Sequence, residues 1–126
     1  MIEQALGTIS VKLNEIGVPY EFMQWTSPVE DRYWVGEFTE VPTYSEDGYE
    51  ETTFILTGTT RKSWLTLMQD RNTIRNHFPT VNGFRVKTDN GAVVIYYENA
   101  FPVPTGEADL KRIQINLRIM AWKGMN

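Results

Sequence analysis

Gly58, Lys62 and Ser63 lie between a predicted strand and a predicted helix, the place where phosphate-binding loops carry a Lys-Ser pair. Such a loop needs a glycine directly before the lysine, so that the backbone can wrap around the phosphates. Arg61 stands there instead, and Leu56 occupies the position of the loop's first glycine. The motif is therefore incomplete, and we interpret the segment as a helix N-terminus with solvated basic residues.

His77 is the single histidine, and no cysteine occurs in the chain. The absence of cysteine excludes a disulfide framework, a thiolate nucleophile and a Cys-ligated zinc site. His77 has no serine or carboxylate at a spacing typical of a catalytic pair, and it falls near the end of a predicted helix, where it stabilises the helix end or faces solvent. No two acids are marked out by apolar surroundings for glycoside chemistry. We therefore expect no enzyme activity, no metal and no cofactor.

An acidic segment follows Pro42. It contains Glu46, Asp47, Glu50 and Glu51, with Tyr44 and Tyr49 among them. The spacing of the acids does not follow the calcium-binding loop of an EF-hand, which disfavours a calcium site. Tyrosine supplies contact area at low entropic cost, so this segment is predicted to be the exposed tip of a hairpin that contacts a basic partner surface.

Basic and aromatic residues also lie on the last predicted strand, at Arg112, Arg118 and Trp122. Nucleic-acid-binding proteins use this combination for phosphates and bases, and an ordinary polar outer face is the alternative. The whole chain has 12 basic and 16 acidic residues and a net charge of −4. This balance argues against sequence-specific binding of nucleic acid, so we interpret these residues as a surface for protein partners.

The first elements are defined by spacing. Five apolar residues recur at steps of three and four, which predicts an amphipathic helix from Ile2 to Ile16. Gly17 and Pro19 end this helix. A strand is predicted from Tyr20 to Trp25.

A long hairpin comes next. Its strands are predicted at Arg32–Val41 and Thr52–Thr59, with the acidic segment Pro42–Glu51 as its tip. The spacing of the apolar residues then changes from the alternation of a strand to the steps of three and four of a helix. A second helix is therefore predicted from Arg61 to Phe78, capped by Thr59 or Thr60. Pro79 ends that helix.

Three strands complete the chain. Phe84–Thr88 and Ala92–Glu98 flank Asp89-Asn90-Gly91, which is a strong signal for a tight hairpin turn. Strict alternation predicts the last strand at Leu110–Trp122. A straight strand of that length spans about 40 Å, which exceeds the roughly 35 Å diameter of a compact chain of this size. We therefore expect it to bend or to project beyond its sheet.

These elements predict an α+β fold for one domain, residues 1–126, in the order α-β-β-β-α-β-β-β. Two helices cover one face of a mainly antiparallel sheet. The other face is expected to receive Trp34, Phe38, one side of the stretch Val93-Val94-Ile95-Tyr96-Tyr97, Met120 and Trp122, an excess of apolar surface that indicates assembly with further subunits. The alternative is a sheet that curls and packs these side chains internally. No signal sequence or membrane span is apparent, so we expect a soluble, untargeted protein.

The chain resembles the tail terminator, or tail completion, proteins of long-tailed bacteriophages and prophages. The likeness lies in the short acidic chain, the N-terminal helix, the hairpin with an acidic tip, the second helix and the long alternating last strand. The stretch Tyr33-Trp34-Val35-Gly36-Glu37-Phe38 is similar to prophage-encoded neck proteins.

The resemblance implies a non-enzymatic structural protein that forms a ring, expected to be a hexamer, on the tail tube. It implies that the ring stops tube polymerisation and joins the tail to the head through a head-completion protein. The implied location is the neck of the virion tail, with assembly in the host cytoplasm, no membrane and no sequence-specific nucleic acid. The alternatives are another neck or minor tail component, such as a head-completion protein, and a small-molecule-binding α+β module.

Overall fold

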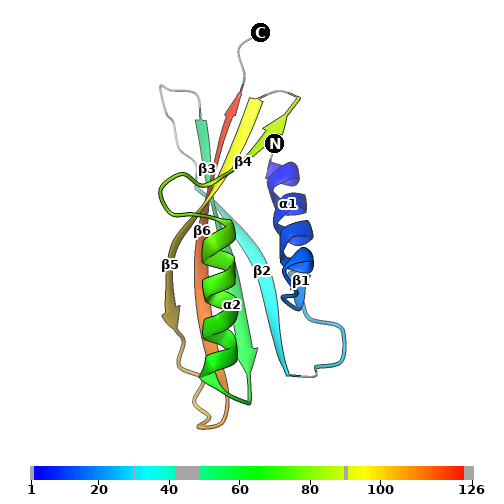
Figure 1. Ribbon diagram of the computed structural model, residues 1–126, viewed down its shortest axis with the longest axis vertical. Coiled ribbons are helices and arrows are strands. Elements are labelled where there is room, and N and C mark those ends of the chain that lie inside the picture. The colour runs from blue at the N-terminus through cyan, green and yellow to red at the C-terminus, as the bar shows by residue number, and fades with distance from the viewer. Residues whose placement is uncertain (1, 30, 42–48, 90, 124–126) are drawn as a thin grey trace.

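The computed structural model describes residues 2–29, 31–89 except 42–48, and 91–123. In Figure 1 two helices lie over one elongated sheet. The helices are α1 (Ile2–Glu15) and α2 (Trp64–His77). The strands are β1 (Tyr20–Phe22), β2 (Arg32–Val41), β3 (Tyr49–Thr60), β4 (Phe84–Thr88), β5 (Gly91–Pro102) and β6 (Lys111–Lys123).

The six strands form one sheet in the order β1-β2-β3-β6-β5-β4. Among the described strands only β1 pairs in parallel, with β2, and the other four pairings are antiparallel. The last strand of the chain therefore lies at the centre, between β3 and β5. The predicted fold class and element order are confirmed.

The end of α1 follows from its sequence. Gly17 has a φ of 77° and lets the chain turn back, so that the Val18 amide donates to the Leu13 carbonyl and the Gly17 amide donates to the Asn14 carbonyl. Val18 and Leu13 are both buried, and their contact closes the cap. Ala5, Ile9 and Leu13 form the buried stripe of the helix.

The start of α2 differs from the prediction. Its N-cap is Ser63, whose hydroxyl accepts a hydrogen bond from the Leu65 amide at 3.1 Å. Thr59 and Thr60 belong to β3, because its cross-strand partners continue to Lys111. The helix thus begins three residues later than expected, and it ends at His77, one residue before Phe78.

The core lies between the helices and one face of the sheet. Leu67 and Ile74 of α2 and the α1 stripe pack against inward side chains of the central strands, namely Phe54, Leu56, Val93, Ile95, Ile113, Ile115, Leu117 and Ile119. Burial of this much apolar surface is the main stabilising contribution to such a fold.

Trp34 lies on this helix-covered face, which corrects its expected place on the uncovered one. Its side chain is fully buried, opposite Gly58. Phe38 also lies on this side of β2 and not on the uncovered face as expected; it is 37% exposed and stacks on Phe22 with ring centroids 6.2 Å apart. The alternation along β2 was predicted, but not the face that the helices cover.

Strand lengths also differ from expectation. β3 begins at Tyr49, so Glu50 and Glu51 lie in the strand rather than in the loop, and β5 continues through Phe101 and Pro102. β1 ends early, at Phe22, where the next residue, Met23, has a φ of 69°. β6 does not project from the sheet, because β3 and β5 are almost as long and pair with it throughout. A bulge between Tyr97 and Asn99 adjusts the register of β5.

Candidate assembly interface

The sheet face turned away from both helices, here called the open face, carries mixed side chains. The strand registers place on it Tyr33, Val35, Glu37, Ile55, Thr57, Val94, Tyr96, Gln114, Asn116, Arg118, Met120 and Trp122. Its centre is polar: Gln114 donates to Asn116 at 3.0 Å, and Asn116 donates to Asn99 at 2.9 Å. Apolar and aromatic side chains lie on both sides of this centre, with Tyr33 and Val35 toward one end and Val94, Tyr96, Met120 and Trp122 toward the other.

That end holds an aromatic cluster formed by Tyr49, Glu51, Tyr96, Arg118 and Trp122. The Tyr49 and Trp122 rings are cross-strand neighbours with centroids 6.0 Å apart. The Arg118 guanidinium lies 5.1 Å from the centre of the Tyr96 ring, and its Nε lies 3.6 Å from Oε1 of Glu51. The strands β5, β6 and β3 thus bring two pairs to this end of the open face, Arg118 with Tyr96 and Tyr49 with Trp122.

This composition suits a protein contact. Arginine, tyrosine and tryptophan are enriched in interfaces, because they combine large contact area with polar groups. The Arg118 side chain remains 41% exposed and Trp122 is only partly buried. The cluster is therefore ordered by its own contacts and still accessible to a partner.

The structure brings together four of the predicted contact residues, Tyr49, Glu51, Arg118 and Trp122. Glu50 faces the helix side of the sheet and is exposed there, opposite Ala121. Arg112 lies at the other end of the open face, where its Nε donates to the Thr59 hydroxyl at 3.3 Å. Tyr44, Glu46 and Asp47 lie outside the described residues.

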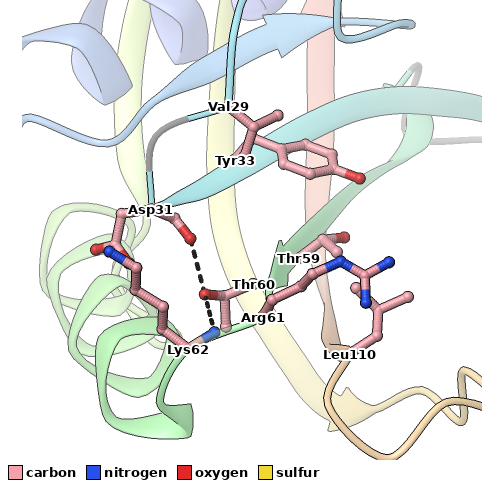
Figure 2. A pocket seen from close by; sticks show the side chains of 8 residues that line it. All are labelled: Val29, Asp31, Tyr33, Thr59, Thr60, Arg61, Lys62 and Leu110. Carbon is pink, nitrogen blue, oxygen red and sulfur yellow. Dashed lines mark hydrogen bonds and ion pairs between the residues drawn. The ribbon is translucent and has the colours of Figure 1, made fainter.

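A cavity of about 480 Å³ opens at the end of the sheet away from the aromatic cluster (Figure 2). Its lining includes Asp31, Thr60, Arg61 and Lys62. Nζ of Lys62 lies 3.9 Å from Asp31, and the Thr60 hydroxyl donates to the Asp31 carbonyl. Arg61 forms ion pairs with Glu107 at 3.1 Å and Asp109 at 2.9 Å. The basic residues of the incomplete phosphate motif are thus engaged with acids of the same chain.

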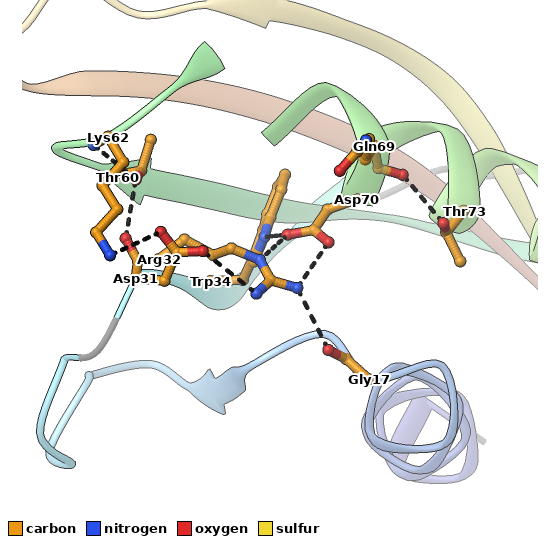
Figure 3. Close-up of polar contacts among 9 residues, drawn as sticks. All are labelled: Gly17, Asp31, Arg32, Trp34, Thr60, Lys62, Gln69, Asp70 and Thr73. Atoms are coloured by element: carbon orange, nitrogen blue, oxygen red, sulfur yellow. Dashed lines mark hydrogen bonds and ion pairs between the residues drawn. The ribbon is translucent and has the colours of Figure 1, made fainter. Parts of the chain in front are cut away.

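A network of hydrogen bonds around Asp70 connects α2 to the sheet (Figure 3). Asp70 accepts hydrogen bonds from Nε of Arg32 at 2.6 Å and from Nε1 of Trp34 at 2.8 Å. Arg32 also donates to the Gly17 carbonyl at 3.4 Å, which reaches the end of α1. The hydrogen bonds to Asp70 raise the pKa of Arg32. These contacts hold the two helices and β2 together and serve the fold.

The turn after β1 is held by an exposed carboxylate. Glu21 accepts a hydrogen bond from the Thr26 hydroxyl at 2.6 Å and from the Ser27 amide at 3.2 Å. The hydrogen bond from Thr26 is the main cause that lowers the pKa of Glu21 below its ordinary value.

The described residues offer no group of three or more His, Cys, Asp or Glu side chains placed to hold a metal ion. His77 lies at the end of α2 as expected, with Nδ1 at 2.9 Å from the Thr73 carbonyl. Neither helix in the described part of the chain is long and apolar enough to cross a membrane.

The sequence predicts one side of Val93–Tyr97 on the uncovered face, but it does not identify Tyr96 as a contact residue. Its neighbour Tyr97 is also a tyrosine, but its side chain faces the core, where it is 6% exposed. Only the register of β5 against β6, with Tyr96 opposite Arg118, separates the two. The alternation of β5 alone does not say which tyrosine faces inward.

Comparison with known proteins gives structural likeness only. No family model and no curated protein sequence matches this chain. A solved chain named only by a sequence identifier aligns over 100% of this chain and 99% of its own length, with a TM-score of 0.74 and 12% identity. A chain from the virion of a native gene transfer agent particle aligns over 98% of this chain and 92% of its own length, with a TM-score of 0.64 and 14% identity. At these identities the comparisons establish a shared fold.

Proposed function

We propose that this protein is a structural component of a phage or prophage virion, and specifically a tail terminator. In this role copies of the chain form a ring on the tail tube, stop its polymerisation and join it to the head. The observation that carries the proposal is the likeness to a chain of the gene transfer agent virion, which extends over 98% of this chain. Because nearly the whole of both chains aligns, the likeness concerns the complete fold rather than a common motif.

The open face supports an assembly role. Both helices pack on the opposite side of the sheet, so the aromatic cluster is left for a partner. The proposed partners are further copies of this chain, the tail tube protein and a head-completion protein. The proposed location is the neck of the virion tail, after assembly in the host cytoplasm.

The described polar groups also fit a non-enzymatic role. Asp70 is buried, and its carboxylate is used by Arg32 and Trp34 to hold the fold. Around the cavity beside Asp31, the side chains of Arg61 and Lys62 are in ion pairs. A small-molecule enzyme would instead present convergent polar groups to a pocket.

The test is deletion of the gene in a phage that encodes it, followed by electron microscopy of the lysate. A tail terminator predicts tails of irregular length that do not join heads, and a plasmid copy of the gene restores infectious particles. Tails of normal length on infectious particles contradict the proposal. Tails of normal length beside unattached heads identify another neck component, such as a head-completion protein.

A further inference from the structure

Part of β2 lies at the edge of the sheet with no strand beside it. The short strand β1 pairs only with residues 34–36, whereas β2 continues to Val41. The chain leaves the sheet at Met23, whose φ is 69° and whose amide donates to the Gly36 carbonyl at 2.8 Å. Residues 37–41, here called the free segment, therefore have β3 on one side and no strand of the described chain on the other.

The backbone of the free segment is available for pairing. On the side of β1 the Trp34 amide donates to the Pro19 carbonyl, so the even-numbered residues of β2 direct their backbone groups toward this edge. By alternation the amide and the carbonyl of Phe38 face the edge too, with no described strand to receive them. An edge of this kind is a template for another strand.

Apolar side chains are exposed on the helix side of the same edge. The rings of Phe22 and Phe38 stack on each other and are 44% and 37% exposed. Met23, which follows β1, is 60% exposed. Exposed apolar side chains that adjoin one another mark contact sites more often than scattered ones do. The edge thus combines unpaired backbone groups with uncovered aromatic rings.

This part of the chain is acidic. Residues 18–31 and 37–51 contain no Lys or Arg, while acids recur in both ranges. Glu37 is exposed on the open face and makes no ion pair or side-chain hydrogen bond with a described residue. Arg118 lies two strands away and is paired with Glu51. Charge complementarity therefore indicates a basic occupant for the edge.

A second copy of this chain does not supply that occupant. Two β2 edges paired about a two-fold axis would set acids against acids. The basic edge strand β4 is level with residues 91–95 of β5, whereas Glu37 is level with Asn99. A shift that brings Arg85 to Glu37 sets Phe84 at the position where β1 already pairs with β2. The occupant is therefore expected in another protein.

We propose that the free segment of β2 receives an extended basic segment of a partner protein as an added strand. Side chains of a strand alternate between the two faces of a sheet, so those on the helix side contact Phe22 and Phe38 and those on the open face lie beside Glu37. The segment therefore alternates apolar and basic residues over about five positions. The inference deepens the proposed function and rests on it for the partner being another virion protein.

NMR spectroscopy of the full-length, nitrogen-15-labelled protein tests the contact with a synthetic peptide. The probe is acetyl-Lys-Val-Lys-Phe-Lys-Val-amide, which has the proposed alternation. We expect it to shift the amide signals of residues 37–41 with a Kd of about 0.1–1 mM. At about ten times the Kd it slows hydrogen exchange of the Phe38 amide about tenfold. The Thr39 amide faces β3 and keeps its exchange rate.

Two matched peptides separate the charge from the backbone pairing. In the first, Glu replaces each Lys, and we expect no binding because its carboxylates meet Glu37. In the second, every backbone nitrogen of the Lys peptide is methylated, which keeps the side chains and removes the N–H donors. We expect this peptide to bind about tenfold more weakly than its parent or worse.

Variants of the protein test the acidic edge directly. Glu37→Lys is expected to weaken binding of the Lys peptide about tenfold or more, because repulsion replaces attraction. Glu15→Lys makes the same change of charge at an exposed position of α1 and is expected to leave binding unchanged. Circular dichroism verifies that both variants are folded.

The proposal is overturned if the Lys peptide leaves the signals of residues 37–41 unmoved at about 1 mM. It is also overturned if the Glu peptide or the methylated peptide binds as tightly as the Lys peptide, or if Glu37→Lys binds unchanged. Protection of the Phe38 amide in the protein alone, lost on dilution, overturns it as well, because a second copy then covers the edge.

The peptide experiment and the gene deletion fail independently. Normal tails together with binding of the Lys peptide at residues 37–41 reject the tail terminator and keep the edge site. Irregular tails without peptide binding do the reverse.

Discussion

Trp34 lies flat over the backbone of Gly58, its cross-strand neighbour in β3. A β carbon at position 58 would lie 2.6 Å from carbons of the indole, which is too close for any side chain. The close approach places the fully buried indole so that its Nε1 reaches Asp70 at 2.8 Å. The glycine of the incomplete phosphate motif is therefore needed for packing.

Substitution Gly58→Ala is expected to lower the free energy of unfolding by about 1–3 kcal/mol, because the indole must move and its bond to Asp70 is strained. The matched control is Gly7→Ala on the exposed side of α1, where a β carbon meets nothing within 4 Å. That change is expected to raise stability by about 0.5–1 kcal/mol. Urea denaturation measures both, and an unchanged midpoint for Gly58→Ala contradicts this packing.

Removal of the Asp70 carboxylate by Asp70→Ala is expected to cost about 2–3 kcal/mol, since the half-buried Arg32 loses its partner and Trp34 loses its acceptor. A double-mutant cycle with Trp34→Phe is expected to show coupling of about 0.5–3 kcal/mol. Glu51→Ala, which removes the acid of a more exposed ion pair, is the control and is expected to cost less than about 1 kcal/mol. Additive effects of Asp70→Ala and Trp34→Phe argue against the shared hydrogen bond.

Trp122 and Trp34 lie on opposite faces of the sheet and are expected to respond differently to an aspartate. Trp122→Asp keeps its far-ultraviolet circular dichroism and weakens self-association, because its ring belongs to the open face. Trp34→Asp buries a charge in the core and does not fold. Circular dichroism with sedimentation checks both, and an unfolded Trp122→Asp variant shows that Trp122 belongs to the core.

The carboxyl of Glu21 is expected to titrate below its ordinary pKa, because the Thr26 hydroxyl donates to its charged form. The folded pKa is lower than the unfolded one, so the stability from this contact is present above the unfolded pKa and is lost as the pH falls through the folded pKa. Thr26→Val should raise the pKa toward the ordinary value. Carbon NMR of the Glu21 carboxyl measures this pKa. An unchanged titration midpoint in Thr26→Val shows that the backbone amides of residues 26 and 27 are sufficient to keep the pKa low.

Both helices and the order of all elements were predictable from spacing. The apolar stripe from Ile2 to Ile16 and the glycine after it define α1 without any tertiary contact. Strand ends were less predictable, because β3 and β5 are extended by pairing with β6. That pairing joins residues about 60 positions apart for β3, beyond the reach of local pattern.

The face of Trp34 could not be predicted, because β2 has bulky apolar residues on both sides. The outcome is decided by Gly58 across the strand pair, which leaves space for an indole on the helix side. The predicted contact residues Tyr49, Glu51, Arg118 and Trp122 do converge, because β3 and β6 are neighbours.

The central position of β6 has a consequence for synthesis in the cell. Residues 111–123, which form β6, are translated after all the other strands of the sheet, yet they must insert between β3 and β5. Until they leave the ribosome, the two halves of the sheet have no common neighbour and the apolar sides of β3 and β5 stay uncovered. Folding of the sheet therefore waits until residues 111–123 have left the ribosome, and chains that stop before residue 111 are expected to be captured by chaperones or degraded.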